Sequence, residues 1–122
     1  MSRSTRITFG VHFCVALLLG LPMLLAPGRW LDIVEWQPVD PIISRLFGAA
    51  LLGLAWGSFR SWRATDWDQV AFIVELEVVF TVLGIIGLLR HLIFNVYPWY
   101  VWTLFLVLAL FAIAWIVALF RK

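Results

Sequence analysis

The sequence predicts an all-α integral membrane protein, a four-helix antiparallel bundle that forms a single domain over residues 1–122. Two observations support this prediction. Hydrophobic residues make up 64% of the chain and charged residues only 13%, whereas soluble domains are about half apolar and a quarter charged. The apolar residues also gather into four long runs, each near the ~20 residues that a helix needs to cross a bilayer.

The four runs predict membrane-spanning helices over about residues 7–27, 42–60, 68–94 and 99–120. Each run is expected to be helical because lipid offers the backbone no hydrogen-bond partners. A shorter segment, over about residues 29–39, mixes charged with large apolar residues. This mixture predicts an amphipathic segment that lies along the membrane surface.

Proline and aspartate mark the ends of the predicted helices. Pro22 is expected to kink the first helix or to end its regular part. Asp40 followed by Pro41 is a good start for the second helix, because proline suits a first helical turn. Asp66 or Asp68 is expected to cap the third helix.

The basic residues predict the topology. Six of the nine lie at the end of the bundle that carries both termini: Arg3, Arg6, Arg60, Arg63, Arg121 and Lys122. Because basic residues concentrate on the cytoplasmic side, both termini are expected in the cytoplasm of a bacterial-type inner (plasma) membrane. A net charge of +2 spread along the chain makes no basic patch and argues against nucleic acid as a partner.

Small residues indicate where the helices approach one another closely. The second predicted helix carries Ala49, Gly53 and Gly57 at four-residue steps, and the third carries Gly84 and Gly87. Helices in lipid associate through such small residues, which are expected to pack the bundle internally. A dimer face is the rival interpretation.

Two carboxylates lie within the apolar third helix. Glu75 and Glu77 are about 200° apart around a helix, so they point to nearly opposite sides. Glu77 shares its side with Thr81, and His12 of the first helix lies at a similar depth. We therefore predict a polar intramembrane site of His12, Glu75, Glu77 and Thr81, in which Glu77 faces the bundle and Glu75 faces a partner subunit. Alternatively, this part of the helix lies near the headgroups and both carboxylates are hydrated.

Three basic side chains lie toward the opposite end of the predicted helices. Arg45, Arg90 and His91 are candidates for an anion or lipid-headgroup site. The alternative is that the arginines extend to the headgroups individually.

The sequence carries no motif that indicates an enzyme. Ser44 and Ser58 are expected to have no histidine at matching depth, so no catalytic triad is predicted. His12 and His91 are expected to be separated by most of the membrane, which argues against one haem between them. No metal site and no cofactor are predicted, although a bound lipid, quinone or pigment fits such a bundle.

The stretch DPIISRLFGAALLGLAWGSFR, residues 40–60, resembles the second helix of small bacterial four-span membrane proteins, some of which are grouped as DoxX-like. The resemblance covers the four-helix layout and the run of Asp-Pro, Arg and Gly-Ala-Ala. Members of the DoxX group have been linked to quinol-oxidising respiratory complexes as accessory subunits. The resemblance implies an accessory role and carries over no catalytic residue.

Three functions follow as hypotheses. The first is a non-catalytic accessory or structural subunit that assembles with other membrane subunits or with itself. The second is a small oligomeric transporter or proton-conducting protein that uses Glu77 and His12. The third is the binding of an apolar pigment, quinone or lipid between helices, with Trp56 and Trp115 as walls.

Overall fold

A computed structural model describes residues 1–121, and every regular element in that range is helical. The elements are α1 (Arg3–Leu25), α2 (Pro27–Ile33), α3 (Pro41–Trp62), the short 3-10 turn η1 (Trp67–Gln69), α4 (Ala71–Phe94) and α5 (Trp99–Phe120). The four long helices are each long and apolar enough to cross a membrane. The predicted all-α four-helix membrane bundle is therefore confirmed.

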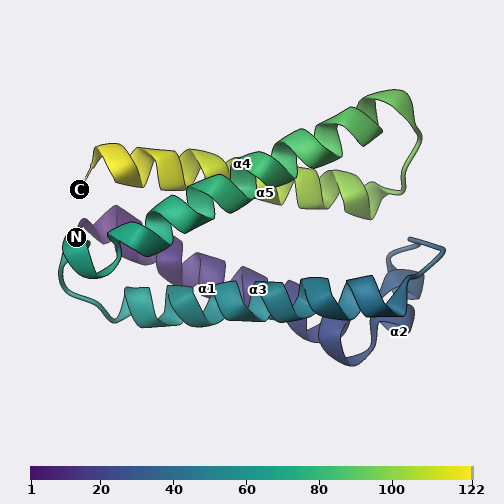
Figure 1. Cartoon of the computed structure of the whole chain (residues 1–122), viewed down its shortest axis with the longest axis horizontal. Coiled ribbons are helices and arrows are strands. Elements are labelled where there is room, and N and C mark those ends of the chain that lie inside the picture. The colour runs from purple at the N-terminus through teal and green to yellow at the C-terminus, as the bar shows by residue number, and fades with distance from the viewer. Residues whose placement is uncertain (122) are drawn as a thin grey trace.

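The four long helices form two pairs. α1 packs along α3, and α4 packs along α5, whereas α3 touches α4 only sparingly. Both termini lie at one end of the bundle, the terminal end, and α2 lies at the other, the α2 end (Figure 1). From the terminal end toward the α2 end, α4 diverges from α3 (Figure 1). Because the bundle is antiparallel, its loops alternate between these two ends.

Capping side chains set several of the helix boundaries. The Ser2 hydroxyl accepts a hydrogen bond from the Thr5 amide at 3.1 Å, so α1 begins earlier than predicted. Asp40 accepts hydrogen bonds from the amides of Ile42 and Ile43, both at 3.0 Å, and caps α3 as predicted. Pro22 lies inside α1, which continues for three more residues.

The start of α4 differs from the prediction. Residues Trp67–Gln69 form the 3-10 turn, and α4 begins after Val70, which offers no side-chain cap. The Asp66 carboxylate, just before this turn, accepts hydrogen bonds from the hydroxyl of Thr65 and the side-chain amide of Gln69. The turn therefore uses the aspartate that was expected to cap the helix.

Two apolar clusters join the helix pairs. At the terminal end, a buried cluster from α1, α4, α5 and the residue before α4 consists of Phe9, Val70, Val74, Trp115 and Ala118. At the α2 end, a second cluster unites Met23, Leu31, Val34 and Tyr100. The pairs are therefore held together near both ends of the bundle.

The segment predicted to lie on the membrane surface covers the α2 end of the bundle. Its apolar side chains Leu31 and Val34 are buried against α1 and α5, and Trp30 Nε1 donates a hydrogen bond to the Tyr100 hydroxyl at 3.1 Å. Arg29 and Asp32 are exposed. The segment is amphipathic, but Leu31 and Val34 on its apolar face pack against α1 and α5 of the bundle.

The close approach of α1 and α3 is made by Gly48, a glycine outside the predicted packing stripe. A Cβ atom on Gly48 would lie 2.6 Å from the Leu24 backbone nitrogen and 2.8 Å from the Gly20 carbonyl oxygen. Ala49 and Gly53 instead face outward, so the predicted packing stripe is wrong by one residue at that point. The use of this stripe as a dimer face stays a prediction.

The other predicted packing glycines have different surroundings. A Cβ on Gly57 would make an ordinary contact with Ile73 of α4 at 3.7 Å, and one on Gly84 would meet Leu108 of α5 at 3.0 Å. A Cβ on Gly87 would meet nothing within 4 Å. Gly84 therefore allows a close contact between α4 and α5, whereas Gly87 leaves open space.

The outer surface of the bundle is apolar. Large side chains such as Leu18, Leu83 and Ile113 are each more than 60% exposed, and many others on the four long helices resemble them. Water would not tolerate so extended an apolar surface, whereas lipid tails solvate it. The chain is a small multi-pass membrane protein.

Candidate functional site

A cavity of about 500 Å³ lies between the two helix pairs. Its walls come from all four long helices and from the segment that follows α1, and they are almost entirely apolar, with Leu19, Phe47, Leu104 and Phe111 among them. Cavities of this size and character hold small organic molecules in other proteins. The cavity lies where α4 diverges from α3 toward the α2 end (Figure 1), while α2 and the residues after it cover that end.

The two ends of the cavity are polar. His12 and Thr81 line it toward the terminal end, and Trp36 and Asp40 line it at the α2 end. Met23 also lines it, and from His12 to Met23 along α1 the distance is roughly 16 Å. The cavity is therefore elongated along the helices.

One side of the cavity opens at the surface of the bundle, between α3 and α4. Ile43 of α3 and Gly87 of α4 both line the cavity and are both exposed at the surface. Gly87 leaves open space where a side chain would stand. α3 and α4 diverge toward this end of the bundle (Figure 1), and the cavity is open at the surface where these exposed residues line it.

A cluster of buried polar side chains lies at the terminal end of the cavity. His12 Nδ1 is 2.7 Å from the hydroxyl oxygen of Ser58, and His12 Nε2 is 3.4 Å from Glu77 Oε2. Thr81, one turn along α4 from Glu77, donates its hydroxyl hydrogen to the Glu77 carbonyl oxygen at 2.7 Å. The cluster connects α4 to α1 and α3. α4 otherwise has little contact with α3.

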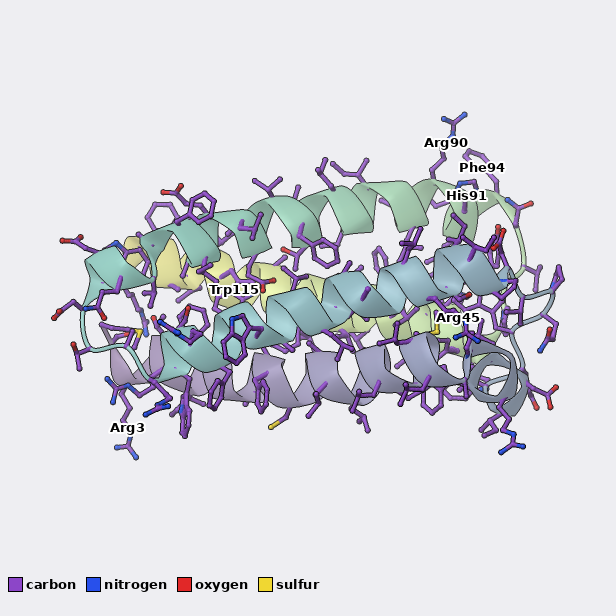
Figure 2. All side chains as sticks on the ribbon, turned by 60° about the horizontal axis from the view of Figure 1, so that its bottom comes forward. Arg3, Arg45, Arg90, His91, Phe94 and Trp115 are labelled. Atoms are coloured by element: carbon purple, nitrogen blue, oxygen red, sulfur yellow. The ribbon has the colours of Figure 1, made fainter. Side chains whose placement is uncertain are left out.

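Aromatic rings surround the histidine of this cluster. The Phe111 ring meets the His12 ring edge-on, with centroids 4.8 Å apart, and the Trp115 ring lies 5.5 Å away. Trp115 lies inside the bundle between the helices (Figure 2) and is fully buried. These rings exclude water from the cluster and fix the orientation of the imidazole.

Three buried polar atoms of this region have no hydrogen-bond partner among residues 1–121. They are both carboxyl oxygens of Glu77 and the indole nitrogen of Trp115. In the same range His12 is the basic side chain within ion-pair distance of Glu77. A buried carboxyl group within the membrane is costly without a partner, and His12 is the polar neighbour that the structure places beside Glu77.

Ser58, His12 and Glu77 have the residue types of a hydrolytic triad, and their contact corrects the expectation that Ser58 has no histidine at its depth. Chemistry would require a substrate carbonyl to reach the Ser58 oxygen. Ser58 is fully buried, and the residues that line the cavity do not include it. The arrangement favours a structural hydrogen bond over a nucleophile.

Glu75 does not join the other predicted members of the polar site. It is exposed, whereas Glu77 is 0% exposed, as their angular separation predicts. Glu75 lies only ~6 Å along α4 from Ala71, so its carboxylate is close to the depth of the headgroups. Of the four predicted residues, the structure brings together His12, Glu77 and Thr81.

The three basic residues predicted near the α2 end do not form one site. Arg45 donates a hydrogen bond from Nη1 to the Leu24 carbonyl oxygen at 3.3 Å, close to the end of α1. Arg90 and His91 point away from α4 into the surroundings, well apart from Arg45 (Figure 2). Each group can contact lipid headgroups separately.

The tryptophans predicted as walls of a ligand site have other roles. Trp56 is 62% exposed on the outside of α3, and Trp115 packs behind His12. Phe47 and Phe111 are the aromatic residues that line the cavity instead, together with Trp36 and Phe80. The spacing of aromatic residues in the sequence does not predict which of them line the cavity, because they occur on every side of these helices.

Metal binding can be assessed from the same arrangement. In the part of the chain that the structure describes, no group of three or more histidine, cysteine, aspartate or glutamate side chains is placed to hold a metal ion.

Comparisons of the chain with models of protein families, with curated proteins and with solved structures find no match, so the site itself is the basis for a function.

Proposed function

We propose that this protein binds one elongated apolar molecule from the bilayer, such as a lipid, quinone or pigment, in the cavity between its helix pairs. The observation that carries the proposal is the cavity itself, about 500 Å³ in volume and lined by apolar side chains along most of its length. An apolar site inside a membrane protein gains nothing over lipid unless its shape fits a particular molecule. The proposed activity is therefore selective binding.

Transport of protons or ions is less well supported by this arrangement. A conducting path needs polar groups along its whole length, because ions and protons are costly in apolar surroundings. Here His12, Glu77 and Thr81 are gathered toward one end, and the walls beyond them, such as Leu19 and Leu108, are apolar. The observed distribution of side chains suits the binding of an apolar molecule. It does not provide the continuous polar path that conduction needs.

The role of an accessory subunit in a larger assembly, or of a homo-oligomer, stays a prediction. Its main support in the sequence was an outward-facing Glu75 that needed a protein partner. Because Glu75 lies about one turn from the start of α4, headgroup water can hydrate its carboxylate instead. A protein that binds a lipophilic molecule could still serve such an assembly.

Replacing Gly87 with phenylalanine is expected to lower the amount of bound molecule severalfold. The new ring would fill the entrance between α3 and α4 without meeting a neighbour at its Cβ, so the fold has room for it. The measurement is mass spectrometry of apolar molecules extracted from protein purified in native-lipid discs.

The matched control is Gly53→Phe. Gly53 also has open space around it, but it faces outward and does not line the cavity. We expect the wild type and this control to retain one molecule per chain. Equal retention by Gly87→Phe and Gly53→Phe would contradict the proposed site.

A further inference from the structure

We propose that the bound molecule carries a hydroxyl head group, which is held at the terminal end of the cavity by Glu77 beside His12, with its apolar chain extending toward α2. This inference rests on the proposed function and specifies its ligand. It starts from three polar atoms without a hydrogen-bond partner among residues 1–121, Glu77 Oε1, Glu77 Oε2 and Trp115 Nε1, which belong to two side chains that both neighbour His12.

Such unpaired atoms require an explanation. More than about 90% of buried polar groups in folded proteins have a hydrogen-bond partner. Here three lack one among residues 1–121, and they belong to two fully buried residues that both pack against His12. The concentration of unmet hydrogen-bonding groups beside a cavity indicates a polar group that binds there.

Glu77 and Trp115 do not line the cavity themselves, so the head group reaches the carboxyl when a side chain that does line it, His12 or Thr81, turns aside. His12 and Thr81 both line the cavity, and Glu77 lies one helical turn below Thr81. The contact of 3.4 Å between His12 Nε2 and Glu77 Oε2 is longer than the 2.7–3.2 Å of a good hydrogen bond. A modest rotation of either side chain therefore exposes the carboxyl without breaking a strong interaction.

The chemistry of the unpaired atoms selects the head group. A hydroxyl both donates and accepts, so it can donate to a carboxyl oxygen of Glu77 and accept from the indole N–H of Trp115. A phosphate or carboxylate would place a second negative charge beside Glu77 in a medium of low dielectric constant. A purely apolar molecule would leave all three atoms unpaired.

The test compares three probes with the same chain: dodecanol, dodecyl methyl ether and dodecane. The ether accepts a hydrogen bond but cannot donate one, and the alkane does neither. Binding to wild-type protein in lipid discs is measured relative to the Gly87→Phe variant, which corrects for partition into lipid. We expect dodecanol to bind about tenfold more tightly than the ether, the value of one hydrogen bond to a buried polar group.

Two variants show whether Glu77 is the acceptor. In Glu77→Leu the preference for the alcohol is expected to fall nearly to one. In Glu75→Leu, which removes a carboxylate two residues away on the exposed side of α4, the full preference is expected to remain. A preference that survives Glu77→Leu would overturn the assignment.

The probes keep this inference separate from the function on which it rests. If the three probes bind equally well and all more strongly than to Gly87→Phe, the hydroxyl head group is wrong and the binding cavity stands. If none binds above that variant, the proposed function is itself wrong. The comparison of probes on wild-type protein decides the matter even if Glu77→Leu does not fold.

Discussion

The His12→Leu variant is expected to lose about 1–3 kcal/mol of stability, because the buried polar groups of Ser58 and Glu77 lose their neighbour on α1. Leucine fills most of the space of the ring but offers no nitrogen to Glu77 or to Ser58. The Glu77 carboxyl would then lie fully buried without its basic neighbour. The measurement is equilibrium unfolding of the purified protein in mixed micelles.

The double variant His12→Leu/Glu77→Leu separates this mechanism from a general loss of packing. Replacing both members of a buried pair with apolar residues is often neutral or stabilising by about 1–4 kcal/mol. We therefore expect the second substitution to restore most of the stability that the first removes. Strictly additive losses in this double-mutant cycle would show that the His12–Glu77 contact does not matter to the fold.

The second large effect is expected from Gly48→Leu. A Cβ at this position would approach two backbone atoms, the Leu24 nitrogen and the Gly20 oxygen, within 2.8 Å or less. Backbone atoms cannot rotate aside, so α1 and α3 must separate. We expect a loss of at least about 3 kcal/mol or failure to fold, measured by the same unfolding assay.

Ala49→Leu is the matched control for this substitution. Ala49 is the next residue on α3 and is exposed on the outside of the bundle. Its replacement is expected to change stability by less than about 0.5 kcal/mol. If Ala49→Leu were as damaging as Gly48→Leu, the packing face of α3 would be the one that the sequence analysis predicted.

Much of the fold could be predicted from the sequence because the bilayer constrains it strongly. Lipid sets the length of each apolar run and forces it to be helical, so four runs give four helices. Helical geometry also separates Glu75 from Glu77, because two residues turn a helix by about 200°. The depth of His12 follows from its distance along α1, which places it near Glu77.

The parts that could not be predicted depend on how the helices rotate and tilt. Gly48, Ala49, Ala50 and Gly53 are small and lie on several sides of α3, so their spacing did not identify the face that meets α1. The rotation of α3 that places Gly48 against α1 also brings Ser58 next to His12.

The cavity itself has no sequence signature of its own. It arises because α4 diverges from α3 while α2 covers one end (Figure 1). Half of its lining residues are leucine, phenylalanine or valine, which occur equally in a filled core. Only the relative tilt of the two helix pairs distinguishes a binding cavity from close packing.

Photochemical labelling tests the central claim, that a lipophilic molecule occupies this cavity, most directly. The probe is a dodecanol analogue with a photoactivatable diazirine at the end of its chain, and the labelled residues are identified by mass spectrometry. We expect adducts on Phe47 and Leu104, which line the cavity toward the α2 end. Equal or stronger labelling of their exposed, lipid-facing neighbours Leu46 and Leu106 would contradict it.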